Sequence, residues 1–221
     1  MHITDGLVHD VNILDILEFE ADAFYIMDRG YLDWARLFSI HSTKAFFVTR
    51  AKKNFAFTRQ SSNSTDRTTG VICDQLIYLK NLEAIKDYPQ KIRRVKYHDK
   101  ELNKTFVFIT NHFDASALEI ALLYKNRWQI ELFFKWIKQH LRVKTFWGET
   151  PNAVKSQIWV AVCSYVLVVI LKENLKTSQT MNEILQILSV SIFDKTPVNQ
   201  LITNYDSQNK IDDSYNSLTL F

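Results

Sequence analysis

The segment YKNRWQIELFFKWIK, residues 124–138, combines a single carboxylate with several cations and a run of aromatic side chains. At about 100° per residue, one helical stripe about 60° wide holds four polar residues: Tyr124, Arg127, Glu131 and Lys138. The other positions are largely apolar, so we expect a mostly buried helix. Because unpaired buried charge is costly, the polar stripe needs partners, and a metal ion plus a nucleic-acid backbone would supply them. The alternative is an ordinary surface ion pair of Glu131 with Arg127 or Lys135.

The spacing Y-x2-R-x3-E-x6-K resembles the Tyr-Arg-Glu-Lys signature of insertion-sequence DDE transposases of the insertion-sequence-four type. Trp128, directly after the arginine, adds to the match. The resemblance also implies an upstream strand that ends in aspartate, followed by glycine and an aromatic residue. The stretch AFYIMDRGY has Asp28, Gly30 and Tyr31 in those places. The similarity extends over about residues 2–175, which is most of the chain.

The resemblance implies an α/β fold, an RNase H-like catalytic core that is incomplete at its N-terminal side. It also implies a β-rich insertion before the helix that carries the glutamate. The implied domains are residues 1–50 as the last strands and helices of the partial core, 51–111 as the cationic insertion, 112–195 as the C-terminal helices that complete the core, and 196–221 as a polar tail.

Asp28 and Glu131 match the second and third carboxylates of the family's catalytic triad, so the resemblance implies that both are catalytic metal ligands. Hard oxygen ligands suit Mg²⁺, and two such ions could activate the nucleophile and stabilise the leaving oxygen. Tyr124, Arg127 and Lys138 would contact DNA phosphates near the transposon end. From local sequence alone, Asp28 could equally be a turn-forming carboxylate paired with Arg29.

The implied reaction is hydrolysis at the end of the element, followed by attack of the freed 3′-hydroxyl on DNA. The implied partners are transposon ends, target DNA and a second copy of the chain in a synaptic complex. We expect a cytoplasmic protein associated with the nucleoid, without a membrane segment. At Trp128 we expect core packing rather than insertion between bases.

The first catalytic aspartate of the family has no match. Only 27 residues precede Asp28, whereas the missing strands and helix need about 40 residues or more. Asp5 and Asp10 fall in the turn and cap before the first expected helix and do not substitute. The resemblance thus covers a C-terminal portion of a catalytic domain, with an incomplete two-metal site, and we expect this polypeptide alone not to cleave DNA. A noncatalytic DNA-binding remnant that interferes with an intact transposase, and an RNase H-like nuclease, stay open as alternatives.

The composition indicates a globular protein, with 47% hydrophobic and 13% aromatic residues in a chain of 221. Cys73 and Cys163 provide neither a disulfide framework nor metal-ligand spacing, which fits a reducing cytoplasm. The N-terminal residues lack the basic and apolar regions of a signal peptide. The most apolar stretch, residues 158–171, is short for a membrane span and suits a buried core helix.

The charge is unevenly distributed, although the net charge is only +3. Residues 1–43 carry 2 basic and 8 acidic side chains, whereas residues 44–104 carry 14 basic and 6 acidic ones. Such a cationic block suits a phosphate-binding surface. The alternative is a solvated surface with scattered lysines, or a sheet with one wet face.

The hydrophobic patterns predict the order of the elements. We expect helices at residues 10–20, 31–41, 116–141, 154–175 and 181–193, strands at 1–4, 23–27, 44–52, 71–79, 91–97 and 105–110, and a polar loop at 58–70. Ser116 and Glu119 form an S-x-x-E capping box for the long helix. We expect residues 218–221 to dock the end of the tail.

Overall fold

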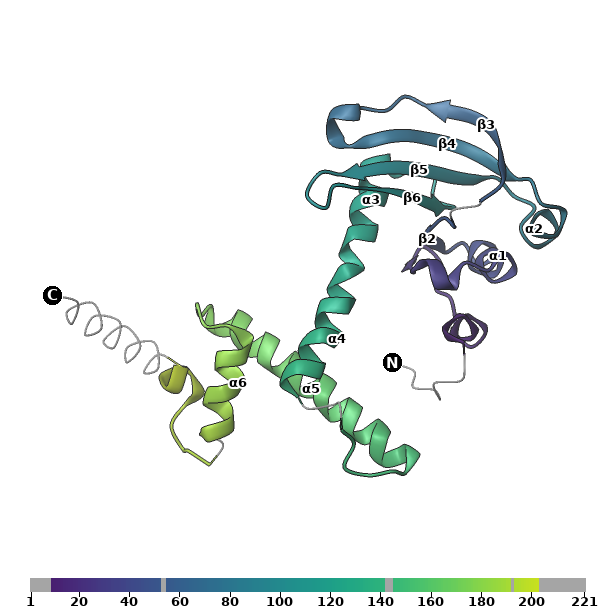
Figure 1. The fold of residues 1–221 in the computed structure, drawn as a ribbon. Coiled ribbons are helices and arrows are strands. Elements are labelled where there is room, and N and C mark those ends of the chain that lie inside the picture. The colour runs from purple at the N-terminus through teal and green to yellow at the C-terminus, as the bar shows by residue number, and fades with distance from the viewer. Residues whose placement is uncertain (1–8, 53–54, 142–144, 192, 203–221) are drawn as a thin grey trace. The chain divides into compact units, whose positions relative to one another are not determined.

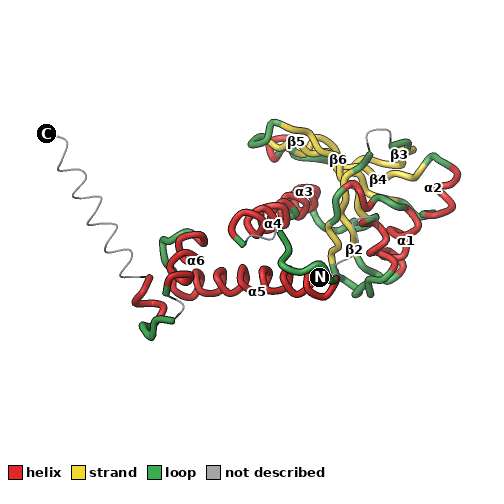
Figure 2. Tube along the Cα trace, turned by 60° about the horizontal axis from the view of Figure 1, so that its bottom comes forward, coloured by secondary structure: helices red, strands yellow, loops and turns green. Residues whose placement is uncertain are grey.

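The computed structural model describes residues 9–52, 55–141, 145–191 and 193–202. The strand expected at residues 1–4 and the docked end expected at 218–221 lie outside these residues. The chain forms two compact units, Met1–Glu131 and Leu132–Phe221. The first contains a mixed α/β arrangement around a six-stranded sheet, and the second is helical (Figures 1 and 2).

The sheet has the strand order β1-β2-β6-β5-β4-β3. Its first pair, β1 with β2, is parallel, and every other neighbouring pair is antiparallel. The strands are β1 (Phe24–Ile26), β2 (Phe46–Arg50), β3 (Phe57–Asn63), β4 (Val71–Leu79), β5 (Ile92–Asp99) and β6 (Lys104–Thr110). The strands expected from hydrophobic patterns in the first unit are therefore confirmed within a few residues, apart from the one that begins the chain.

The two faces of the sheet are packed by different helices. On the α1 face, buried side chains of α1 (Trp34–Ser42) and the half-buried Ala84 of α2 (Leu82–Asp87) meet alternate residues of the strands. The fully buried core on this face includes Leu37, Ile40, Phe47, Ile77, Ile92 and Ile109. On the α3 face, α3 (Ala117–Asn126) packs through Ile120, Ala121 and Tyr124 onto Val48, Val95 and Phe108.

Several short elements differ from their predicted bounds. The helix expected at residues 10–20 is the 3-10 helix η1 (Asp10–Asp15), with His9 rather than Asp10 at its N-cap. Another 3-10 helix, η2 (Arg29–Tyr31), precedes α1, whose true N-cap is Asp33. The side chain of Asp33 accepts a hydrogen bond from the backbone N–H of Arg36, which ends the extended segment before the helix.

The prediction of a polar loop at residues 58–70 is wrong. Its first half is the edge strand β3, followed by the 3-10 helix η3 (Arg67–Thr69). Six of the seven residues of β3 are exposed, so the strand has no buried face to impose an apolar alternation on its sequence. A bulge between Arg59 and Ser61 further breaks the period of two.

The long helix expected at residues 116–141 is divided at Arg127. It consists of α3 and α4 (Trp128–His140), with Arg127 as the C-cap of α3. Backbone N–H groups of Arg127 and Ile130 donate to carbonyls three residues earlier, the pattern of a 3-10 turn. The capping box of Ser116 and Glu119 is confirmed at the start of α3.

The second unit contains the last turns of α4 with α5 (Pro151–Leu175) and α6 (Met181–Val190). Tyr165 of α5 packs against the rings of Phe133 and Trp136. The α5 helix is long and apolar enough to span a membrane by length and composition, a test that core helices of soluble proteins also pass. The prediction that it is largely buried is wrong for the described residues, because α6 covers only part of its surface and just Ala161 and Val168 are buried.

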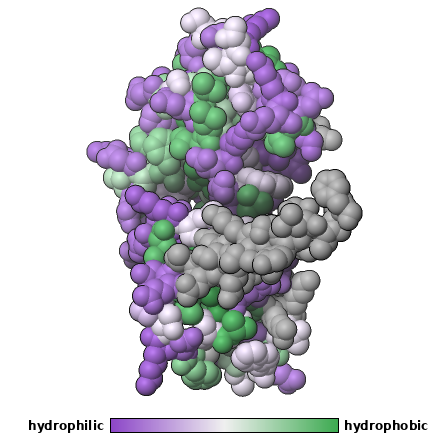
Figure 3. All heavy atoms as spheres, turned by 90° about the vertical axis from the view of Figure 1, so that its left-hand side faces the viewer, coloured by the Kyte–Doolittle hydropathy of each residue, from purple (hydrophilic) through white to green (hydrophobic). Residues whose placement is uncertain are grey.

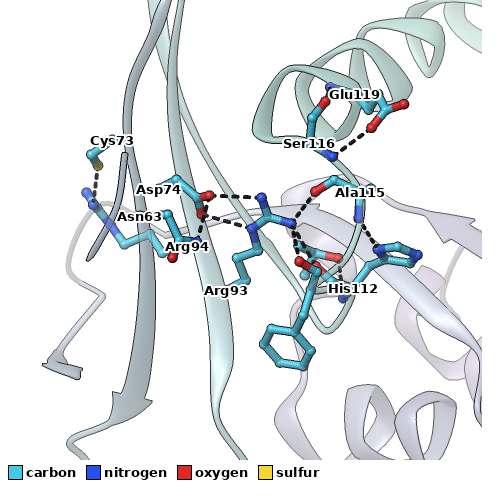
Figure 4. A network of polar contacts seen from close by, with 11 residues as sticks. Asn63, Cys73, Asp74, Arg93, Arg94, His112, Ala115, Ser116 and Glu119 are labelled. Atoms are coloured by element: carbon cyan, nitrogen blue, oxygen red, sulfur yellow. Dashed lines mark hydrogen bonds and ion pairs between the residues drawn. The ribbon is translucent and has the colours of Figure 1, made fainter. Parts of the chain in front are cut away.

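A buried ion pair on the α3 face joins β4, β5 and the segment that leads into α3 (Figure 4). Arg93 and Asp74 are 3% and 4% exposed. The guanidinium donates from Nε to Oδ1 of Asp74 at 2.8 Å and from Nη2 to Oδ2 at 2.9 Å. Its Nη1 donates to the backbone carbonyls of His112, Phe113 and Ala115 at 3.2, 3.1 and 2.5 Å. Arg93 thus fixes the loop directly before the cap of α3.

We predict that Arg93→Met lowers the free energy of unfolding by about 3–5 kcal/mol, because it leaves the Asp74 carboxylate buried without its cation. Urea denaturation followed by circular dichroism would measure the change. Asp15→Ala is the matched control, since it removes the bidentate partner of Arg36 in an exposed pair and should cost far less. Equal losses in the two variants would contradict the structural importance of the buried pair.

Hydropathy over one face of the molecule is drawn in Figure 3. Hydrophilic side chains predominate there, with hydrophobic ones in smaller groups between them. This distribution agrees with a mean hydropathy of −0.14. Most globular surfaces include apolar atoms, so such groups need no special explanation.

Candidate functional site

A cleft of about 480 Å³ lies on the α3 face, between the hairpin of β5 and β6 and the end of α3. Its walls combine aromatic rings with cations. The lining residues are Arg50, Tyr97, Asp99, Glu101, Leu102, Lys104, Phe106, Phe108, Ala121, Tyr124, Lys125, Arg127, Trp128 and Gln129. Two residues of the predicted polar stripe, Tyr124 and Arg127, are therefore brought to one concave surface within the first unit.

Tyr124 is held in the wall of the cleft by packing. It is 7% exposed, and its ring lies 4.7 Å from that of Phe108, centroid to centroid. Its hydroxyl group is buried and has no hydrogen-bond partner among the described residues. Burial raises the pKa of this hydroxyl, and the charges of Arg127 and Arg50 lower it. The Arg127 guanidinium also lowers it by approaching the hydroxyl, although the two are too poorly aligned for a regular hydrogen bond, and the charge of Asp28 raises it. The charges of Arg127, Arg50 and Asp28 thus all act on Tyr124.

Arg127 lies beside Tyr124, with its guanidinium carbon 5.5 Å from the centre of the tyrosine ring. Its Nη2 donates to Oε1 of Glu131 at 2.5 Å, whereas its Nε is buried without a partner among the described residues. Burial by itself lowers the pKa of Arg127, but the hydrogen bond to Glu131 contributes to a net increase, so the guanidinium stays charged. The ordinary i, i+4 ion pair between Arg127 and Glu131, one of the alternatives from sequence, is present.

The two unpaired polar atoms, Tyr124 Oη and Arg127 Nε, indicate what the cleft can bind. Buried donors without partners are costly in a folded protein, and nearly all buried polar groups are satisfied. Both groups can donate a hydrogen bond to an oxygen atom. A ligand rich in anionic oxygen, such as a phosphate group, would therefore satisfy both of them.

Arg50 is a further residue of the site that sequence reasoning missed. It ends β2 two residues after Val48, so it lies on the α3 face, and its guanidinium carbon is 5.0 Å from the centre of the Phe106 ring. The only signal in the sequence was its place in the cationic block of residues 44–104. Lys125 also lines the cleft, but Glu101 at 2.5 Å and Asp99 at 3.7 Å offset its charge.

Asp28 follows directly after β1 and Met27, as the sequence predicts. Its Oδ1 accepts the backbone N–H of Gly30 at 2.6 Å, and its backbone carbonyl accepts from Thr49 Oγ1 at 2.9 Å. A Cβ atom at Gly30 would lie 2.9 Å from this Oδ1, so the glycine permits the close approach of the carboxylate. The side chain therefore forms a turn. It is half-buried, and its charge acts on Tyr124 in the wall of the cleft.

The described residues by themselves do not complete a two-metal site. Among the described residues, no group of three or more histidine, cysteine, aspartate or glutamate side chains could hold a metal ion. Asp28 accepts from a backbone N–H, and Glu131 accepts from Arg127. Asp28 acts on Tyr124 through its charge. Glu131 is linked to Tyr124 through Arg127, which binds Glu131 and lies over the tyrosine ring.

Two other predicted residues have different outcomes. Trp128 is 57% exposed and lines the cleft, so the expectation of core packing is wrong. A new helix, α4, starts at this residue after the break at Arg127. Lys138 is an exposed residue of α4 in the second unit, and its participation in the site stays a prediction.

Comparison with known proteins adds independent evidence. The family model described as Transposase DDE domain matches residues 1–167. The chain is 39% identical over 173 residues to y4zB of Sinorhizobium fredii, a protein named as a transposase, covering 76% of this chain and 48% of that protein. It is 34% identical over 170 residues to a protein of Geobacillus stearothermophilus named as the transposase for insertion sequence element IS5377, covering 74% and 43%.

A Synechocystis protein named as a transposase for element IS4SA is 25% identical over 178 residues, covering 77% of this chain and 47% of that protein. The chain thus spans about half the length of the curated relatives it matches. The parallel β1–β2 pair and the mixed α/β sheet are consistent with an RNase H-like DDE domain. Since the family model covers residues 1–167, the chain belongs to the DDE transposase family.

Proposed function

We propose that this chain is part of the catalytic domain of an insertion-sequence transposase of the Tyr-Arg-Glu-Lys group. The proposed activity of the whole protein is metal-dependent hydrolysis of phosphodiester bonds and strand transfer at transposon ends. One observation supports this proposal above the others: Tyr124 and Arg127 line a single cationic cleft in which each has a buried polar atom without a well-aligned partner among the described residues.

In this proposal the cleft binds the DNA backbone. A phosphate oxygen would accept from Tyr124 Oη and Arg127 Nε, and Arg50 would contribute a further positive charge. Arginine is well suited to phosphate because its planar guanidinium presents several donors in a fixed geometry. Lys138 would add a point charge along α4. The aromatic walls would exclude water and strengthen these charged hydrogen bonds.

DDE transposase domains generally use divalent metal ions. We propose that Asp28 and Glu131 supply two of the carboxylates for such ions, with Mg²⁺ as the natural choice for hard oxygen ligands. Glu131 would first have to release Arg127, and a bound phosphate would give this guanidinium a new partner. In the same proposal, residues 1–50 and 112–195 belong to the core, 51–111 are its insertion, and the protein acts in the cytoplasm as a homodimer on two DNA ends.

A second candidate function is favoured by one observation. Because the described residues form no three-ligand metal group, this polypeptide alone is suited to bind DNA without cleaving it. It could then interfere with an intact transposase by occupying its DNA ends. The cleft would bind DNA in both functions. They differ only in whether a metal site is present to cleave it.

We predict that Arg127→Gln weakens binding of a labelled DNA duplex about tenfold and lowers the salt dependence by about one phosphate contact. Tyr124→Phe, which removes only the unpaired hydroxyl, should have a smaller effect in the same direction. Fluorescence anisotropy at several salt concentrations would measure both. Lys125→Gln is the matched control, since Glu101 and Asp99 already offset that charge in the same cleft. An unchanged affinity in Arg127→Gln would contradict the proposed phosphate contact.

We predict that the 221-residue chain binds DNA but does not nick a supercoiled plasmid in the presence of Mg²⁺ or Mn²⁺, because the described residues bring no third ligand together with Asp28 and Glu131. Gel electrophoresis of the plasmid would show the result. Metal-dependent nicking that disappears in Glu131→Gln would refute the noncatalytic function and support a complete site. Nicking that persists in Glu131→Gln would instead indicate a contaminating nuclease.

A further inference from the structure

No helix among the described residues of the first unit packs on the far half of the α1 face of the sheet. Phe47, Ile77 and Ile92 are covered on this face by the core around α1 and α2. Further along β3–β6, the side chains that point the same way are exposed or half-buried. In Figure 1, these strands extend to the left of the end that lies near α2. We call this surface the open sheet face and define it by Arg59, Gln75, Arg94, Lys96, His98 and Thr105.

The strand register assigns these residues to one face. Arg59 is paired with Ile77, and Gln75 with Arg94. Paired residues on neighbouring strands lie on the same side of the sheet, as do alternate residues along one strand. A hydrogen bond of 2.8 Å from Arg94 Nη1 to Gln75 Oε1 confirms the assignment.

The open sheet face carries charge of one sign. Arg59, Arg94 and Lys96 are cations, and β3–β6, all of whose residues are described, place no carboxylate among them. The two aspartates of these strands, Asp74 and Asp99, lie on the α3 face with Arg93 and Lys125. A wet sheet face that served solubility alone would mix both signs of charge. The open sheet face is therefore complementary in charge to an anionic partner.

One of the cations is held in place before any partner binds. The guanidinium carbon of Arg94 lies 4.9 Å from the centre of the Phe57 ring, and its Nη1 donates to Gln75 Oε1 and to Cys73 Sγ at 3.2 Å. Stacking and hydrogen bonding restrict its rotamers, so less entropy is lost when it binds a ligand.

Two cations and a histidine follow one another on β5. Alternate residues of an antiparallel strand are about 6.8 Å apart and point the same way, so Arg94, Lys96 and His98 form one row along the strand. The flanking Thr105, whose Oγ1 is 3.3 Å from His98 Nδ1, adds a neutral hydrogen-bonding group.

We propose that the open sheet face binds the phosphate backbone of duplex DNA, as a second contact surface on the opposite side of the sheet from the cleft. The inference rests on the proposed function only in taking DNA as the polyanion. It requires no metal ion and no cleavage. It also implies that the two faces of one sheet can engage separate duplex segments.

The test compares two pairs of substitutions in the full chain, each of which removes two positive charges. Arg59→Gln/Lys96→Gln changes the open sheet face, and Lys80→Gln/Lys86→Gln changes exposed lysines elsewhere in the first unit. Binding to a labelled duplex of about 30 base pairs of mixed sequence is measured without metal ions, from about 50 to 200 mM NaCl. The charge-conserving pair Arg59→Lys/Lys96→Arg controls for folding.

We expect the open-face pair to lose about tenfold in affinity and about two phosphate contacts in salt dependence, while the other two pairs stay within about twofold of the unmodified chain. Equal behaviour of the open-face and control pairs, or no duplex binding by the unmodified chain, would overturn the inference. A loss in the open-face pair with no loss in Arg127→Gln would support this surface and contradict the proposed role of the cleft. A loss in Arg127→Gln alone would do the reverse.

Discussion

The buried ion pair of Arg93 and Asp74 is the constraint on which the arrangement of the first unit depends. Both groups are almost fully removed from water, so their charges must be compensated within the protein. Asp74 compensates one side of the guanidinium, and three carbonyls of residues 112–115 accept from the other. This geometry ties the loop before α3 to the middle of the sheet. The helix then starts at a fixed point, and its capping box fixes the direction of its first turn.

The position of α3 explains why the cleft contains unpaired polar atoms. From its fixed start, the helix brings Tyr124 against Phe108, and the turn at Arg127 stacks the guanidinium on the tyrosine. Packing therefore places a hydroxyl group and a guanidinium nitrogen where neither makes a well-aligned hydrogen bond within the described part of the chain. Sequences that fold well usually satisfy such groups, and exceptions concentrate at functional sites. The unsatisfied groups lower the stability of the free chain. A phosphate-bearing ligand would stabilise it by accepting their hydrogen bonds.

Strand β5 illustrates how one segment serves both faces of the sheet. Arg93 and Arg94 are adjacent and identical in type, yet they have opposite surroundings. Arg93 points to the α3 face and forms the buried ion pair with Asp74, whereas Arg94 lies over Phe57 on the α1 face. The two-residue period of a strand separates their roles. The same alternation places Lys96 on the open sheet face and directs Asp99 toward Lys125.

The sequence by itself determined the family resemblance, the strand before Asp28, the capping box of α3 and most strands, because these depend on local spacing and on hydrophobic alternation. Only the tertiary structure decided that β3 is a strand, since an exposed edge strand has no buried face to mark it in the sequence. The tertiary structure likewise decided that the long helix is divided at Arg127, that Trp128 is exposed, and that Arg50 of β2 lines the cleft. These features arise from strand register and from the anchoring of α3 by Arg93, which join residues far apart in the chain and leave no periodic trace in it.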